Sequence, residues 1–233
     1  MHNPLRALVA LLFAASLAHP ATGLIIDNFE EGDFSVTDPF SPTTPTFGEV
    51  SGLSGSNVVG GVRLVRVQKT SGGTGNALLV TTGGDDGAVL SSSAPAAALT
   101  DFAFIYDGVA NGASDGSAGA LNIDLSGDAT VDVEASAVSV VGGIRLTLWT
   151  STDSASTGIQ PLVNGTNSLL IDGTLLALDL TDIQAILIAV TDINLGEVPT
   201  ILDIRTTSIP EPGTGFLMAV GLVALAIRRT RSQ

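Results

Sequence analysis

Short apolar runs of four to ten residues recur between turn-forming residues over residues 24–209. In the clearest run, Val131 and Val133 alternate with Asp132 and Glu134. Because successive side chains of a strand point to opposite faces, such a run has one buried and one solvated face. The pattern predicts eleven strands, over residues 24–28, 58–67, 76–82, 87–92, 102–106, 120–125, 130–137, 144–150, 168–171, 183–190 and 201–206.

The rest of the pattern predicts turns and loops instead of helices. Glycine pairs such as Gly72-Gly73 and Gly142-Gly143 separate the apolar runs, and residues 37–45 contain three prolines that indicate an extended loop. No run has a helical period. Eleven strands within 186 residues predict an all-β fold, a two-sheet antiparallel sandwich of jelly-roll type, as one domain over residues 24–209.

The N-terminus has the organisation of a secretory signal peptide. A short basic start precedes an apolar run over residues 7–18, and small residues follow it. Since a membrane span needs about 20 residues, this run is short for an anchor. We expect residues 1–23 to be removed on export; a retained N-terminal anchor is the alternative.

The C-terminal residues 210–233 have three parts in a fixed order. A Pro-Glu-Pro sequence comes first, an apolar run follows within a predicted transmembrane helix over residues 214–227, and arginines end the segment. The arginines favour retention on the cytoplasmic side. This order resembles the PEP-CTERM sorting signal of Gram-negative bacteria. The residues that carry the resemblance are Pro210, Glu211, Pro212, Arg228, Arg229 and Arg231.

The resemblance implies a partner and a location. In that family an exosortase-type membrane enzyme processes the tail, and its substrates accompany exopolysaccharide and biofilm matrix. It therefore implies an exported protein, held transiently in the inner membrane by its C-terminal helix and then present at the cell surface or outside the cell. A permanent single-pass anchor is the alternative.

Composition excludes several chemistries. The chain has no cysteine, and its two histidines, His2 and His19, lie in the predicted signal peptide. This excludes Ser-His-Asp and Cys-His catalysis, the usual zinc sites and disulfides. Residues 24–209 contain 22 acidic and five basic residues, a net charge of about −17, which repels nucleic acid.

The two ends of the predicted domain have a second resemblance. The sequences IIDNFEEGDF and TILDIRTT resemble calcium-containing jelly rolls of the carbohydrate-binding-module type. The resemblance implies that the first and last strands pair and that Asp27, Glu30 and Asp203 share a structural Ca²⁺, which wants six to eight oxygen ligands. Alternatively these carboxylates never meet. Asp85 and Asp86 form a second, weaker candidate.

Saccharide binding and catalysis remain open alternatives. Trp149, on the outward face with Arg145 and Thr147, and Tyr106 are the candidate ligand contacts, although each is also explained as a packing residue. A carboxylate-pair glycosidase is possible by composition, but no motif selects a pair. We expect a non-catalytic surface or matrix protein with extracellular polysaccharide as a partner, and a calcium-stabilised carbohydrate-binding module is the main alternative.

Overall fold

The computed structural model describes residues 23–38, 44–71, 77–81, 87–92, 99–110, 119–136, 142–194 and 199–208. Within it, residues 23–207 form one compact unit. The predicted signal peptide and the predicted transmembrane helix over residues 214–227 lie outside the described residues, apart from Gly23. No helix among the described residues is long and apolar enough to cross a membrane.

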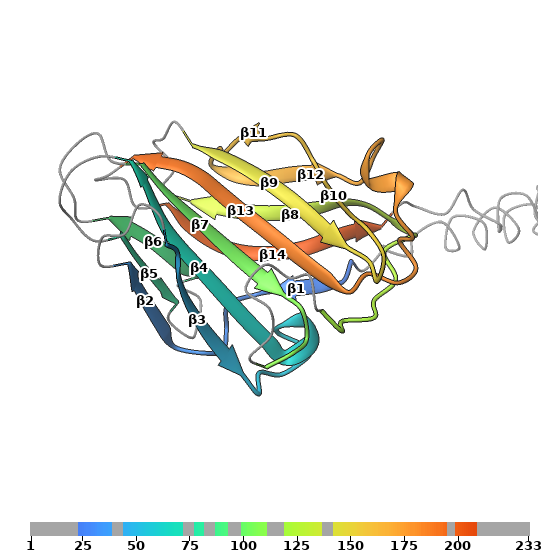
Figure 1. Ribbon diagram of the computed structural model, residues 1–233, viewed down its shortest axis with the longest axis horizontal. Helices are drawn as coiled ribbons and strands as arrows, with labels where there is room; N and C mark the ends of the chain where they lie inside the picture. The colour runs from blue at the N-terminus through green and yellow to red at the C-terminus, as the bar shows by residue number, and fades with distance from the viewer. Residues whose placement is uncertain are drawn as a thin grey trace, which may run out of the picture. The chain divides into compact units, whose positions relative to one another are not determined.

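The unit consists of two stacked antiparallel sheets, as the sequence predicted (Figure 1). Sheet A has the order β12 (Gly165–Leu170), β8 (Asp128–Ser136), β14 (Thr200–Ser208), β6 (Ala88–Ser92), β5 (Ala77–Thr81) and β2 (Phe34–Asp38), with β1 (Ile25–Asp27) also paired to β14. Sheet B has the order β10 (Ser154–Ser156), β9 (Gly143–Trp149), β13 (Ala185–Asn194), β7 (Leu99–Tyr106), β4 (Val62–Ser71) and β3 (Thr46–Ser51), with β11 (Gln160–Pro161) paired to β9. Two short 3-10 helices complete the elements, η1 (Val59–Gly61) and η2 (Leu175–Ala177).

The core lies between the two inner faces. Val131 and Val133 of β8 face residues such as Ile144, Leu146 and Leu148 of β9, and all five side chains are fully buried. Burying large aliphatic side chains contributes about 1.5–3 kcal/mol each. Packing between two complementary apolar faces therefore holds the unit together without a disulfide.

Ten of the eleven predicted strands overlap strands of the structure, and the predicted strand over residues 120–125 is wrong. Residues 120–125 are irregular, with one isolated bridge between Ile123 and Ile183. The predicted extended loop over residues 37–45 is partly wrong, because its first two residues belong to β2. Four strands were not predicted: β2, β3, β10 and β11.

The unpredicted β3 has a glycine where the alternation would place an apolar residue. Gly48 pairs with the fully buried Val65 of β4. A side chain at Gly48 would overlap the ring of Phe34 and the methyl group of Val36, both on β2. The β2 side chains thus fill the position from the opposite sheet, which is why β3 has no visible apolar period.

Candidate functional site

The first and last strands of the unit pair with each other, as the carbohydrate-binding-module resemblance implied. β1 runs antiparallel to β14, with Ile25 opposite Arg205 and Asp27 opposite Ile204. A bulge lies between the two pairs, since β1 advances two residues while β14 advances one. The pairing therefore places Asp27 and Asp203 close together on neighbouring strands. Whether their carboxylates can share a metal ion depends on the direction in which each side chain points.

The Asp27 carboxylate points into the interior and is fully buried. Arg63 of β4 donates to both of its oxygens, from Nε to Oδ2 at 2.5 Å and from Nη2 to Oδ1 at 2.6 Å. The Tyr106 hydroxyl donates to Oδ2 at 2.9 Å, and the Phe29 backbone N–H donates to Oδ1 at 2.9 Å. Four donors satisfy this carboxylate, so it has little capacity left to coordinate a metal ion.

Arg63 also connects the segment after β1 to sheet B through hydrogen bonds. Its Nη1 donates to the backbone carbonyls of Glu31 at 3.1 Å and Gly32 at 3.4 Å, and its guanidinium carbon lies 4.8 Å from the centroid of the Phe29 ring. Burial lowers the pKa of Arg63, but the hydrogen bonds and negative charge of Asp27 outweigh burial, so the pKa is raised. The buried arginine therefore stays charged.

Tyr106 lies at the same buried centre and has no exposed surface. Burial first, and the charge of Asp27 second, raise the pKa of its hydroxyl well above the usual value. It therefore remains a hydrogen-bond donor to Asp27 at all ordinary pH values. A fully buried ring cannot stack on a saccharide, so this geometry does not suit the predicted ligand role of Tyr106.

The other two predicted calcium ligands lie on the outer face of sheet A, away from the buried centre. Glu30 and Asp203 line the same hollow, together with Asn28, Glu134 and Arg205. No three His, Cys, Asp or Glu side chains within the described ranges are arranged to hold a metal ion. Calcium binding stays a prediction, and Asp27 is not placed with its two proposed partners.

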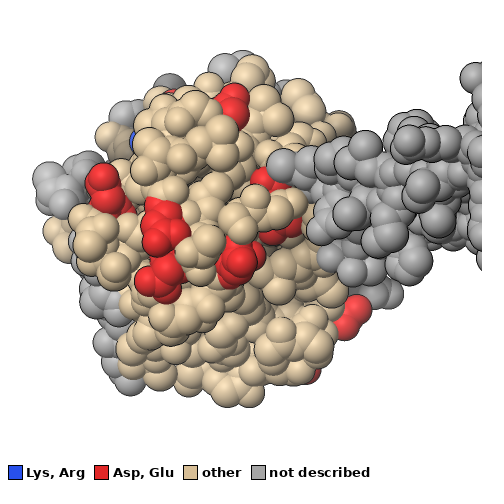
Figure 2. Space-filling model, turned by 90° about the vertical axis from the view of Figure 1, so that its right-hand side faces the viewer, with Lys and Arg blue, Asp and Glu red and all other residues tan. Residues whose placement is uncertain are grey.

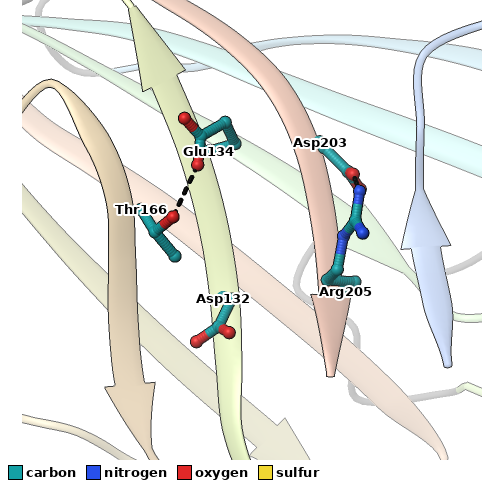
Figure 3. Close-up of a pocket in the computed structure, with 5 residues that line it drawn as sticks. All are labelled: Asp132, Glu134, Thr166, Asp203 and Arg205. Carbon is teal, nitrogen blue, oxygen red and sulfur yellow. Dashed lines mark hydrogen bonds and ion pairs between the residues drawn. The ribbon is translucent and has the colours of Figure 1, made fainter. Parts of the chain in front are cut away.

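An adjoining hollow of about 290 Å³ lies across three strands of sheet A. Figure 3 shows Asp132 and Glu134 on β8, Thr166 on β12, and Asp203 and Arg205 on β14. These side chains share one face because they occupy alternate positions whose neighbours, such as Val131 and Val133, point into the core. The hollow is strongly acidic, with three carboxylates and one guanidinium.

Hydrogen bonds and one ion pair organise the walls of this outer hollow. The Thr166 hydroxyl donates to Glu134 Oε2 at 2.7 Å, and the Thr207 hydroxyl donates to Asp132 Oδ2 at 2.6 Å. Arg205 pairs with Asp203 Oδ2. Two further oxygens, Asp132 Oδ1 and Asp203 Oδ1, are buried and have no hydrogen-bond donor among the residues that the structure describes.

Trp149 lies on the outer face of sheet B, as predicted. It pairs with Ala185 of β13 and Ser154 of β10, and it is partly buried against Leu187 and its neighbours. The same face carries Arg145 and Thr147 of β9. Trp149 and the outer hollow of sheet A therefore lie on opposite faces of the sandwich.

The remaining predicted residues fall outside the described ranges. These are Asp85 and Asp86 and the sorting residues Pro210, Glu211, Pro212, Arg228, Arg229 and Arg231. For the sorting residues, comparison with known families gives the decisive observation. The family model of the PEP-CTERM protein-sorting motif matches residues 208–231. The chain carries this sorting motif.

The PEP-CTERM motif begins at Ser208, the last residue of β14. It implies export and processing by exosortase, a membrane enzyme, after transient anchoring. No curated protein matches the chain. A solved structure described as "Solution structure, dynamics and binding studies of CtCBM11" matches with 13% identity, over 75% of this chain and 95% of that chain, at a TM-score of 0.34.

Sequence reasoning missed the partners that decide these sites. Arg63 lies two residues before Val65, at the inward phase of β4 that the fully buried Val65 and Val67 also occupy, and this charged residue at an apolar phase was the available signal. Asp132 and Glu134 were recognised as an outward face, but nothing in the sequence shows that β8 lies between β12 and β14. The outer hollow depends on that strand order.

Proposed function

We propose that this protein is a non-catalytic exported surface or matrix protein, in which the β-sandwich is the functional module and the PEP-CTERM tail delivers it. The observation that carries the proposal is the position of the motif, which starts where the last strand ends. Among the described residues, both hydrophobic clusters lie within residues 26–204, before the motif begins.

The surface charge supports a role in a hydrated exterior. Asp and Glu side chains are spread over the face shown in Figure 2, and almost no Lys or Arg is visible there. Six acidic residues on the loops of the described chain are exposed: Glu30, Asp33, Asp124, Asp153, Asp172 and Asp179. Such a surface keeps a protein soluble and repels anionic lipid and nucleic acid.

Removing the tail tests this proposal. A chain that ends at residue 209 keeps the signal peptide and every strand, so we expect it as a folded, soluble species in the periplasm or medium. The full chain should fractionate with membranes before processing. Sedimentation of the shortened chain with membranes would contradict the proposal, because the module itself would then bind membrane.

Saccharide binding is the second candidate function, and the outer hollow of sheet A favours it. Asp132 Oδ1 and Asp203 Oδ1 are buried acceptors without donors, and sugar hydroxyls can supply such donors. The hollow has room for a ligand at about 290 Å³. A hydroxyl-rich polymer that lies across β12, β8 and β14 would use both oxygens.

Glycan-array binding with matched variants tests this second candidate. Asp203→Asn should weaken binding, whereas Asp172→Asn, which removes the same charge from an exposed loop outside the hollow, should not. Equal effects of the two substitutions would show that net charge, and not the hollow, determines binding. Hydrolysis of any bound polysaccharide would instead support a carboxylate-pair glycosidase.

A further inference from the structure

Two of the few basic residues lie together on the outer face of sheet B. Residues 24–209 contain only five. Of these, Arg63 is paired with Asp27, Arg205 is paired with Asp203, and Lys69 is buried. Arg66 and Arg145 remain, and neither forms an ion pair within the described part of the chain.

The strand register aligns these two arginines in one row. Arg66 of β4 is opposite Ala103 of β7, Ala103 is opposite Ala189 of β13, and Ala189 is opposite Arg145 of β9. Three inter-strand spacings separate the two arginines, about 14 Å between their backbones. Phe47 of β3 extends the row beyond Arg66. We call this line of residues the arginine row.

Burial shows how the two arginine side chains are placed. Ala103 and Ala189 point outward from sheet B, yet both are fully buried. The Nε atoms of Arg66 and Arg145 are also buried, and neither has a hydrogen-bond partner in the part of the chain that the structure describes. Long side chains that lie flat over the alanines explain both observations. A buried N–H without an acceptor is unfavourable, and the Nε–H of each arginine is such a group.

One acidic side chain lies close to the arginine row. Asp101 of β7 accepts a hydrogen bond from the backbone N–H of Asp192 at 3.0 Å. Burial raises its pKa, the charge of Asp192 adds to this, and Arg66 and Arg145 act in the opposite direction. Asp101 is therefore within electrostatic reach of both arginines without pairing with either. Glu49, opposite Leu64, is the acidic residue of the next row.

The next row on the same face supplies apolar and hydroxyl contacts. Ile105, Leu187 and Thr147 are in register, and the Thr147 hydroxyl lies 2.8 Å from the Ser156 hydroxyl. Trp149 is partly buried against this cluster, two residues beyond Thr147 on β9. An indole ring on the same face as hydroxyls and guanidinium groups offers both stacking and hydrogen bonding.

We propose that the outer face of sheet B binds a carboxylate-bearing saccharide, with Arg66 and Arg145 pairing with its carboxylates and Trp149 stacking on a sugar ring. The guanidinium fork matches a carboxylate in two-bond geometry. Both arginine side chains keep some exposed surface, so a carboxylate on this face can reach them. The proposal concerns a different face from the outer hollow and does not depend on it.

A saccharide fits this face better than an acidic peptide. Peptides that bind sheets usually add a strand at an edge, where backbone groups are free. The arginine row crosses the four central strands β4, β7, β13 and β9, whose backbone groups pair with neighbouring strands. Recognition there must use side chains, and a charged row beside an indole suits an acidic sugar polymer.

The single tryptophan makes binding directly measurable. Because Trp149 is the only tryptophan in the chain, intrinsic fluorescence of the full-length protein in detergent reports on this face alone. The probes are short oligosaccharides of galacturonate, glucuronate and alginate, with methyl-esterified oligogalacturonate as the uncharged match. We expect at least one uronate to bind. Its neutral counterpart should bind about tenfold more weakly, because it cannot form one of the charge-assisted hydrogen bonds.

Three variants locate the site. Arg66→Gln and Arg145→Gln should each weaken uronate binding about tenfold, while Arg205→Gln, which removes an equal charge from the opposite face, should not. The proposal is overturned if none of the three uronates binds, if the methyl ester binds as tightly, or if Arg205→Gln has the same effect. Equal binding of oligoglutamate would assign the face to acidic polypeptides and also overturn it.

Discussion

Arg63 and Asp27 form a fully buried ion pair with two parallel hydrogen bonds, 36 residues apart in the sequence. The pair joins β4 of sheet B to the last residue of β1, which belongs to sheet A. Because each charge is buried, each depends on the other for its stability in the interior.

Asp27→Asn should destabilise the protein strongly. It leaves the Arg63 guanidinium buried without a counter-charge, which costs about 3–5 kcal/mol. At roughly 2–4 °C per kcal/mol, the melting temperature should fall by about 10 °C. Asp203→Asn, which breaks the partly exposed pair with Arg205, should change unfolding by less than about 1 kcal/mol. Similar melting of the two variants would contradict the buried-pair interpretation.

Thermal melts with and without calcium test whether the outer carboxylates bind a metal ion separately from Asp27. The sequence predicts that calcium raises the melting temperature through Asp27, Glu30 and Asp203, but the Asp27 carboxylate already has four donors. Any calcium-dependent rise should therefore persist in Asp27→Asn and disappear in Asp203→Asn. Melts in chelator, calcium and magnesium measure this, and a rise that only Asp27→Asn abolishes would contradict the placement of Asp27.

Tyr106 should resist ionisation until the protein unfolds. It is the only tyrosine, so phenolate absorbance reports on this residue alone. Its pKa is raised in the folded state and is about 10 when unfolded. The stabilisation from its neutral form is present below pH 10 and is lost as pH rises above it. Phenolate should therefore appear together with loss of structure by circular dichroism, and ionisation in a folded protein would contradict the buried hydrogen bond.

Asp107→Asn should stabilise the protein at neutral pH. Asp107 is almost fully buried, and its Oδ2 has no hydrogen-bond partner among the described residues, although Oδ1 accepts from the Val109 backbone N–H. Burial raises the pKa of its carboxyl, so the charged form is disfavoured in the folded state. The free energy of unfolding should rise by about 1 kcal/mol relative to the original protein. This increase should appear as pH rises through the raised pKa and vanish below about pH 4.

The matched control is Asp124→Asn. Asp124 is fully exposed, and hydrogen bonds from Ser126 lower the pKa of its carboxyl. Removing this charge should destabilise the protein slightly at neutral pH, opposite in sign to Asp107→Asn. Denaturant unfolding at several pH values measures both, and the same sign for both variants would show that net charge alone determines the effect.

The sequence predicted the sheets well where each strand has one apolar and one polar face. β8 and β9 show this alternation and were predicted almost to their ends. β3 was missed because Phe34 from another strand fills the space at Gly48, and β10 and β11 because they are short and polar. These features depend on tertiary contacts that no local pattern contains.

The candidate sites were less predictable, for the same physical reason. Asp27 and Asp203 were correctly expected on paired strands, but the bulge in β1 and the inward position of Arg63 direct Asp27 to the interior. The outer hollow and the arginine row depend on which strands are neighbours, and residues 134 and 203, or 66 and 145, are far apart in the sequence. Trp149 was placed on the correct face because its own strand alternates clearly.

We propose that the PEP-CTERM motif delivers the sandwich to the exterior. The most direct test replaces Pro210, Glu211 and Pro212 with alanines and leaves the apolar run and the arginines intact, since these alone direct insertion. Mass spectrometry of membrane and extracellular fractions should then find the unprocessed protein, without its signal peptide but with its tail, accumulated in the inner membrane. An unchanged mature mass with unchanged delivery to the surface would contradict the account, because the motif would then be only a spacer.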